Sequence, residues 1–321
     1  MDERDWVAIG KRRVLKILRA RRFASNRQLE KKISEAGPGD MRPEPMKLST
    51  AINELLDDGS LLQHQTPDLG RFFMPSNFGG QPDEERRTEI LRLTQQFRVL
   101  TRNPQACGKA LERVVYSGTT QTGLYTVLGT PDHPPAQGFA INGYVLEREC
   151  DHILIPREFS ATKLVVEDKN LREWLHPSAE EVWGVIGKAL RVPHAIPVLI
   201  CRRMHYVGFP LFRRIGMLGW QVYKQFFSPD HVTEAELEPY RNTDLLGFSD
   251  ITTDLTPPAP LINFFSATIP ANIDEFAERF ESNRALLTEF AITKRMDSSI
   301  PTPERNRLYG EFFARLPAVD E

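Results

Sequence analysis

The residues with the clearest chemical potential lie at the ends of two short apolar runs. Asp151 begins the run 151–155, and a second run, 163–166, is followed by Glu167 and Lys169. Alternate side chains of a strand point to the same face, so Glu167 and Lys169 are expected to lie together at a strand end. If the two strands are neighbours, Asp151 joins them. Two carboxylates beside an ammonium group suit a hard divalent cation and the hydrolysis of a phosphodiester.

Each of these groups has a role in that chemistry. Mg²⁺, or Mn²⁺ in its place, bound by Asp151 and Glu167 would relieve charge on the phosphate and lower the pKa of a bound water. Asp168 lies between the Glu and Lys side chains, and its carbonyl is a natural third ligand. Lys169 can orient the attacking water or stabilise developing charge. Glu112, in an earlier predicted helix, can hold a metal-bound water or a second ion.

Composition sets outer limits on this interpretation. The chain has 321 residues, 40% of them hydrophobic and 26% charged, with a net charge of −2, which indicates a globular protein of two or three domains. Three widely spaced cysteines argue against a disulfide framework or zinc ribbon and for a reducing compartment. No apolar run approaches the ~18 residues of a membrane span. We therefore expect a cytoplasmic protein without a membrane partner.

Residues 1–78 are expected to form one domain of three helices followed by a hairpin. The expected elements are a helix around residues 14–18, a helix capped by Ser25 or Asn26, a helix from Ser49 to Leu56, and strands at Leu61–His64 and Arg71–Met74. With the phrase AINELLDDGSLLQ, residues 51–63, this segment resembles a winged helix-turn-helix. The resemblance implies either contact with DNA or a protein–protein adaptor.

Residues 84–255 are expected to form an α/β domain, and residues 256–321 a helical C-terminal segment without chemistry of its own. For the middle domain we expect helices at 84–100, 106–115, 180–190 and Ile215–Phe227, and strands at 125–129, 139–147, 151–155, 163–169 and Ile196–Cys201. Helical periodicity in the last segment covers 274–290 and 304–316. This order of helices and strands gives a layered α/β structure.

The middle domain resembles the PD-(D/E)xK nuclease superfamily. The pieces that carry the resemblance are GKALERVV with Glu112, ERECDHILI with Asp151, KLVVEDKN with Glu167 and Lys169, EEVWGVIGKALRV, IPVLICRR and GMLGWQVYKQFF. Cys150 stands where the family name has proline. The resemblance implies a restriction-endonuclease-like mixed sheet flanked by helices, and cleavage that leaves 5′-phosphate and 3′-hydroxyl ends.

Several further residues are candidates for contact with the substrate. These candidate nucleic-acid-binding residues are Asn170, Arg172, Lys188, Arg202 and Arg203. Basic residues interleaved with aromatic ones, from residue 202 to residue 214, suit phosphate pairing and base stacking. A solvated loop with a few core aromatics is the alternative interpretation of the same stretch.

Together these features predict a metal-dependent nuclease of low sequence specificity, with DNA the favoured substrate and RNA the alternative. An unspecific cutter must be restrained, so we expect an effector of prokaryotic defence gated by a companion sensor such as a prokaryotic Argonaute. Homo-oligomerisation through the C-terminal helices is a second way to gate it. Two other functions stay open. One is a catalytically silent winged-helix protein that binds nucleic acid or a regulatory partner, and the other is a sequence-specific restriction endonuclease.

Overall fold

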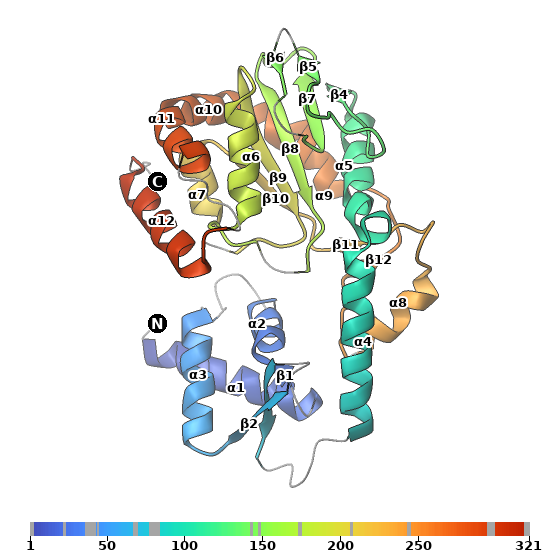
Figure 1. The fold of residues 1–321 in the computed structure, drawn as a ribbon, viewed down its shortest axis with the longest axis vertical. Coiled ribbons are helices and arrows are strands. Elements are labelled where there is room, and N and C mark those ends of the chain that lie inside the picture. Colours follow the sequence, from blue (N-terminus) through green and yellow to red (C-terminus); the bar gives the residue numbers. More distant parts are fainter. Residues whose placement is uncertain are drawn as a thin grey trace. The chain divides into compact units, whose positions relative to one another are not determined.

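The structure is a computed structural model that describes most of the chain. The described residues are 3–21, 24–35, 43, 45–66, 70–76, 84–141, 144–146, 149–172, 175–205, 208–242, 245–293 and 299–317. The chain divides into two compact units, Met1–Val99 with Glu238–Ser249, and Leu100–Leu237 with Asp250–Glu321. This division differs from the three expected segments, because the C-terminal helices belong to the same unit as the large sheet (Figure 1).

The first unit contains a small antiparallel sheet and three helices before its long last helix. Its elements are α1 (Glu3–Arg21), β1 (Ala24–Ser25), α2 (Asn26–Glu35), α3 (Pro45–Asp57), β2 (Leu61–Thr66), β3 (Gly70–Pro75) and most of α4 (Glu84–Arg102), with strand order β1-β3-β2. The residues of α4 from Leu100 on belong to the second unit. Ser25 begins α2 as expected. Its hydroxyl accepts a hydrogen bond from the N–H of Gln28 at 3.2 Å, and the Gln28 side chain accepts one from the N–H of Ser25 at 2.8 Å.

A mixed five-stranded sheet forms the centre of the second unit. Its strands, in spatial order, are β10 (Leu218–Gln221), β9 (Ala195–Cys201), β8 (Lys163–Lys169), β7 (His152–Pro156) and β4 (Tyr125–Leu128). The pairs β4–β7 and β7–β8 are antiparallel, whereas β8–β9 and β9–β10 are parallel. Each parallel pair is joined by a helical crossover, as parallel strands require. The expected mixed α/β arrangement is therefore present.

Helices cover this sheet, and the C-terminal helices extend its core. The helical elements of this unit are η2 (Pro104–Gly108), α5 (Lys109–Thr122), α6 (Glu180–Leu190), α7 (Gly208–Ile215), α9 (Ala259–Asn263), η3 (Phe264–Thr268), α10 (Ile269–Ser282), α11 (Arg284–Thr288), η4 (Glu289–Thr293) and α12 (Thr302–Arg315). Helix α8 (Glu234–Arg241) is divided between the two units, with its residues from Glu238 on in the first. Trp183 of α6 packs against Phe290 of η4 and Phe312 of α12. Because both phenylalanines are buried in the same core as the sheet, the C-terminal segment is part of this fold.

Two short strand pairs differ from or add to the expected elements. The residues expected as one strand at 139–147 form the hairpin β5 (Ala140–Ile141) and β6 (Tyr144–Val145), with residues 142, 143 and 147 outside the described part. Farther along, β11 (Gln225–Phe226) pairs in parallel with β12 (Ile251–Thr252). These short pairs border the large sheet unit and leave the order of its five strands unchanged.

The expected helix at Ile215–Phe227 is wrong. Helix α7 ends at Ile215, and Gly216 takes a positive φ of 75° that interrupts the helix. A Cβ at Gly216 would lie 2.1 Å from the carbonyl oxygen of Phe276, so only glycine fits this close approach. The next residues form β10, which pairs in parallel with β9 at the sheet edge. The final helix of the proposed PD-(D/E)xK order is thus replaced by a strand.

Candidate metal and catalytic site

The pairing of β7 with β8 brings Asp151 to Glu167. The register joins His152 to Val166 and Ile153 to Val165, and its continuation places Asp151 opposite Glu167. The N–H of Asp168 donates a 2.6 Å hydrogen bond to Oδ2 of Asp151. The two strands are therefore neighbours, and the predicted convergence of the two carboxylates at one strand end is present.

Glu167 is bound by two lysines from different elements. Nζ of Lys169 lies 2.6 Å from Oε1 of Glu167, and Nζ of Lys188 lies 2.5 Å from Oε2. Lys169 follows Glu167 on β8, whereas Lys188 comes from the last turn of α6. The side chain of Glu167 is only 9% exposed, so the two ion pairs compensate a nearly buried carboxylate.

The placement of Lys188 differs from the prediction that it contacts phosphates. The spacing of residues along a strand carries no information about a helix that packs over it, so the contact between Lys188 and Glu167 was not predicted. The apolar residues around Lys188 in the sequence were the feature that could have indicated this contact. Lys188 interrupts an almost continuous run of buried residues on α6, from Val182 to Leu190. A lone lysine in such a run indicates an acidic partner nearby.

The acids of this site lie in surroundings that oppose ionisation. Burial raises the pKa of Asp151 to about 7, with further contributions from the charges of Glu167 and Asp168. Burial likewise raises the pKa of Glu112 to about 8, together with the charges of Asp151 and Asp168. Glu112 of α5 therefore belongs to the same electrostatic cluster, as expected of a helix residue near the strand ends.

The lysines have the opposite effect on Glu167. Burial opposes its ionisation, but the ammonium groups of Lys169 and Lys188 outweigh that effect and hold the pKa of Glu167 below its usual value. Although burial favours the neutral amine, the charges of Glu167 and Asp151 raise the pKa of Lys169. Lys169 is therefore a protonated ammonium at neutral pH, which favours charge stabilisation over a role as general base.

Asp168 directs its side chain to the other face of β8, where it meets a histidine. Oδ2 of Asp168 lies 3.2 Å from Nε2 of His152, and neither side chain is exposed to solvent. Burial favours neutral imidazole, yet the carboxylate of Asp168 outweighs it and raises the pKa of His152. The ring of Tyr116 on α5 lies beside this pair, with ring centres 6.1 Å apart. The sequence assigned only the carbonyl of Asp168 to the site, and the pairing of its carboxylate with His152 was not predicted.

Asn170 has a structural role in place of the predicted phosphate contact. Its amide nitrogen donates to the carbonyl oxygens of Cys107 at 2.7 Å and Phe226 at 2.6 Å. Its amide oxygen accepts a hydrogen bond from the N–H of Phe226 at 3.1 Å. These buried bonds use both N–H groups of the side chain, and they fasten η2 and β11 to the end of β8.

Arg172 and Arg202 likewise form contacts within the fold. Both guanidinium groups lie 2.5 Å from Asp250, and the side chain of Arg202 is fully buried. Arg202 also donates to the carbonyl oxygens of Leu171 and Arg172. The prediction that these two arginines bind nucleic acid does not agree with this arrangement. Arg203 lies over the ring of Tyr223, with its guanidinium carbon 5.1 Å from the ring centre.

The donor set at Asp151 and Glu167 fits a hard divalent cation. Among the described residues, no three His, Cys, Asp or Glu side chains are already grouped as a metal site. The fit rests on the facing carboxylates, which are the oxygen ligands that Mg²⁺ and Mn²⁺ prefer. It also rests on the raised pKa values of Asp151 and Glu112, because a cation would relieve the acid–acid repulsion that contributes to both.

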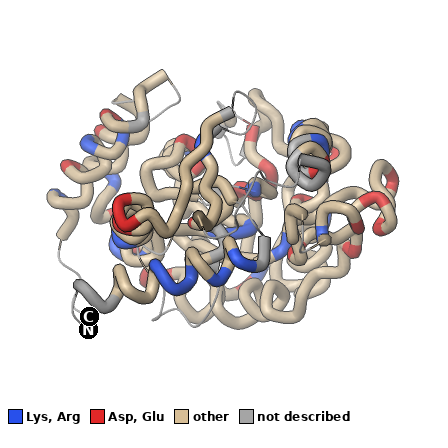
Figure 2. Tube along the Cα trace, turned by 90° about the horizontal axis from the view of Figure 1, so that it is seen from below, with Lys and Arg blue, Asp and Glu red and all other residues tan. Residues whose placement is uncertain are grey.

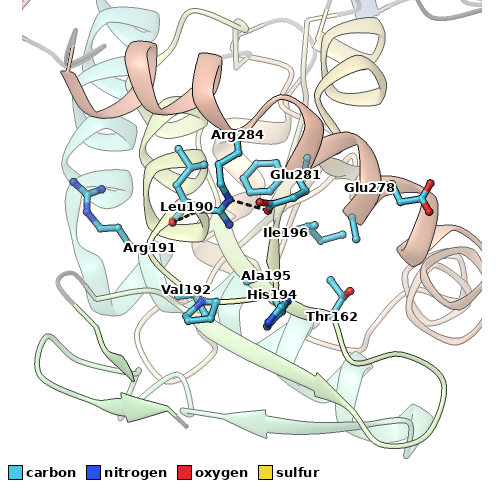
Figure 3. Close-up of a pocket in the computed structure, with 13 residues that line it drawn as sticks. Thr162, Leu190, Arg191, Val192, His194, Ala195, Ile196, Glu278, Glu281 and Arg284 are labelled. Atoms are coloured by element: carbon cyan, nitrogen blue, oxygen red, sulfur yellow. Dashed lines mark hydrogen bonds and ion pairs between the residues drawn. The ribbon is translucent and has the colours of Figure 1, made fainter. Parts of the chain in front are cut away.

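A separate cavity of about 710 Å³ lies at the other end of the strands (Figure 3). It is lined by residues where β8 and β9 begin, including Thr162 and His194, and by α10 and α11. Arg284 spans one wall, donating to Glu281 at 2.7 Å and to the carbonyl oxygen of Leu190 at 2.9 Å. Because Glu167 and its partners lie where β8 ends, this cavity is not part of the candidate site.

Compared with protein-family models, curated proteins and solved structures, the chain shows no significant match. In the part of the chain that the structure describes, no helix combines the length and the apolar character needed to cross a bilayer.

Proposed function

We propose that the protein is a metal-dependent nuclease that hydrolyses phosphodiester bonds at Asp151, Glu167 and Lys169. The observation that carries this proposal is the position of Asp151 opposite Glu167, with the ammonium of Lys169 2.6 Å from Glu167. A structural ion pair between Glu167 and Lys169 does not require a second acid on the neighbouring strand, whereas Asp151 is such an acid and has a raised pKa. The resemblance to the PD-(D/E)xK superfamily rests on these same positions.

The chain's own groups divide the work of the reaction. The cation, held by Asp151 and Glu167 with the carbonyl of Asp168, would supply charge relief on the phosphate and an acidified water. The ammonium of Lys169 stabilises the negative charge that develops on the phosphate oxygens. Glu112 lies within electrostatic reach of Asp151, which suits it to hold a metal-bound water or a second ion.

DNA is the proposed substrate, and α1 offers phosphate contacts. Arg12, Lys16 and Arg19 are exposed and recur at intervals of four and three residues, which places them on one face of α1. Lysines and arginines form blue bands along helices in Figure 2. Contacts of this kind position a duplex without reading its sequence, which supports low specificity. Cleavage of RNA is the variant of this proposal.

The proposed biological role is a partner-gated effector of prokaryotic defence. An unspecific nuclease with a complete site would damage its own cell, so a companion sensor such as a prokaryotic Argonaute would restrain or recruit it. The test is expression with and without candidate partners while the integrity of genomic DNA is followed. Cutting by the lone chain at the same rate as in the partner's presence would refute gating.

One observation favours a second function, a catalytically silent protein that binds nucleic acid or a regulator. Both oxygens of Glu167 are already paired with lysines, so the site is charge-compensated without a cation. Incubation of the protein with plasmid DNA in Mg²⁺, Mn²⁺ or EDTA separates these functions. A smear that requires the cation supports the unspecific nuclease, discrete fragments support a restriction endonuclease, and intact plasmid with bound protein supports the silent binder.

A further inference from the structure

We propose that Lys188 is a positioning residue that occupies the place of the cation in the metal-free protein and yields Oε2 of Glu167 when the cation binds. Lys188 would then set the affinity of the site for divalent metal. This inference rests on the proposed function, because it concerns the same carboxylates. It goes beyond that function by assigning a role to a helix residue outside the strand motif.

Both carboxylate oxygens of Glu167 are paired with lysines in the metal-free protein. Its two oxygens lie 2.6 Å from Nζ of Lys169 and 2.5 Å from Nζ of Lys188, in a site where the carboxylate is 9% exposed. A divalent cation bound to either oxygen would lie within a few ångströms of an ammonium group. Two positive charges at that separation repel strongly where solvent screens them poorly. One lysine must therefore move away for the cation to bind tightly.

The two lysines differ in how readily each can move away from Glu167. Lys169 pairs with Oε1 of Glu167 at 2.6 Å. It is also only two residues from Glu167 on the same strand, which keeps its ammonium close to the site. Lys188 reaches Glu167 from another element through a flexible four-carbon chain, and the bond to Glu167 is its described side-chain contact. Lys188 is thus the lysine that can leave.

Helix α6 is held in place by the C-terminal segment, so only the side chain of Lys188 would move. Trp183 packs edge-on against Phe312 with ring centres 4.9 Å apart, and Arg284 of α11 donates to the carbonyl oxygen of Leu190 at 2.9 Å. The helix is therefore fixed at both ends against the C-terminal segment. A fixed helix returns Lys188 to Glu167 whenever the cation dissociates, which keeps the carboxylate compensated and oriented.

Direct measurement of metal binding tests this inference. Calorimetric titration of the full chain with Mn²⁺, without DNA, should give a dissociation constant for Lys188→Gln that is roughly threefold or more below wild type. Lys188→Arg, which keeps the charge, should stay close to wild type. The control is Lys163→Gln, because Lys163 is a buried lysine that donates to the carbonyl oxygen of Pro193 at the opposite end of β8 from Glu167.

The outcomes separate this inference from the proposed function. Binding by wild type that is lost in Asp151→Asn establishes the metal site, and equal or weaker binding by Lys188→Gln would then overturn only the role of Lys188. If wild type binds no Mn²⁺ at this site, the proposed function fails and the inference fails with it. Should Lys188→Gln not fold, Lys188→Met keeps the length of the apolar stem and gives the same comparison.

Discussion

Continuation of the β7–β8 register by one residue places Asp151 opposite Glu167, and Oδ2 of Asp151 accepts a 2.6 Å hydrogen bond from the N–H of Asp168. The two carboxylates nonetheless have opposite electrostatic surroundings. Two lysines hold the pKa of Glu167 down, while burial and the neighbouring acids raise the pKa of Asp151 to about 7. Two neighbouring acids whose pKa values are shifted in opposite directions are a common feature of catalytic sites.

The raised pKa values predict that the metal-free protein loses stability as the pH rises from about 5 to 8. Asp151 and Glu112 keep their protons in the folded state up to about pH 7 and 8, whereas the unfolded chain has already released them. His152, with its raised pKa, acts in the same direction. Thermal unfolding in EDTA at several pH values should show the midpoint falling, by about 5 °C if the loss is ~2 kcal/mol.

Asp151→Asn is the variant that checks this pH effect. The amide keeps an oxygen that can accept the bond from Asp168, but it cannot ionise, so its midpoint should fall less between pH 5 and 8. Addition of Mg²⁺ at pH 8 should raise the midpoint of wild type and not that of the variant. Identical pH profiles for the two proteins would contradict the position of Asp151 in a buried acid cluster.

The ion pairs of Asp250 predict a stability effect without an effect on binding. Asp250→Asn leaves Arg172 and the fully buried Arg202 without their acid, which should lower the free energy of unfolding by about 3 kcal/mol. Urea unfolding measures this loss, and the affinity for DNA should not change. Asp230→Asn removes the exposed partner of Arg113 and should unfold near the wild-type midpoint. A larger loss from Asp230→Asn would refute the structural role of the Asp250 pairs.

The shared core predicts that the C-terminal helices cannot be removed without loss of the sheet unit. Phe312 is completely buried between Trp183 and Phe290, so Phe312→Ala should cost about 3–5 kcal/mol. Phe209→Ala is the matched control, because that ring is 40% exposed. Unfolding followed by Trp fluorescence gives both values. Equal midpoints for the two variants would mean that the C-terminal segment folds apart from the sheet.

The exposed cations of α1 predict a salt-dependent contact with DNA. Reversing the charge of Arg12, Lys16 and Arg19 to Glu should weaken binding of duplexes of any sequence and flatten the dependence of affinity on salt. Fluorescence anisotropy at several salt concentrations measures both quantities. The control with the same change in net charge carries Glu at three exposed basic residues of the second unit, Arg102, Arg157 and Lys224. Equal losses in the two triple variants would exclude a specific role for α1.

The sequence predicted those parts of the structure that depend on a local pattern of residues. Helix α6 and strands β7, β8 and β9 follow from apolar runs with clear ends, and the convergence of Asp151 with Glu167 follows from strand alternation. The prediction of a helix at 215–227 was wrong because a short apolar run has no periodicity that distinguishes a helix from a buried strand. Gly216 and Gly219 within this run were the sequence features that argued against a continuous helix.

Contacts between distant parts of the chain could not be predicted in this way. Arg202 meets Asp250, 48 residues later, and Asn170 meets Phe226, 56 residues later. A basic or amide side chain near a motif has the same local pattern whether it binds a phosphate or an internal acid. Only the packing of later elements on the strand ends decides between the two, as it does for Lys188 and Glu167.

The central claim is tested most directly by two lysine variants of the same strand. Lys169→Ala and Lys163→Ala each remove a lysine from β8, one at Glu167 and one at the opposite strand end. Purified wild type, both variants and any required partner are incubated with plasmid DNA in Mg²⁺, Mn²⁺ and EDTA. We predict cation-dependent cleavage by wild type and Lys163→Ala, and a loss of at least about a hundredfold in Lys169→Ala. Full cleavage by Lys169→Ala, or cleavage in EDTA, would contradict the account.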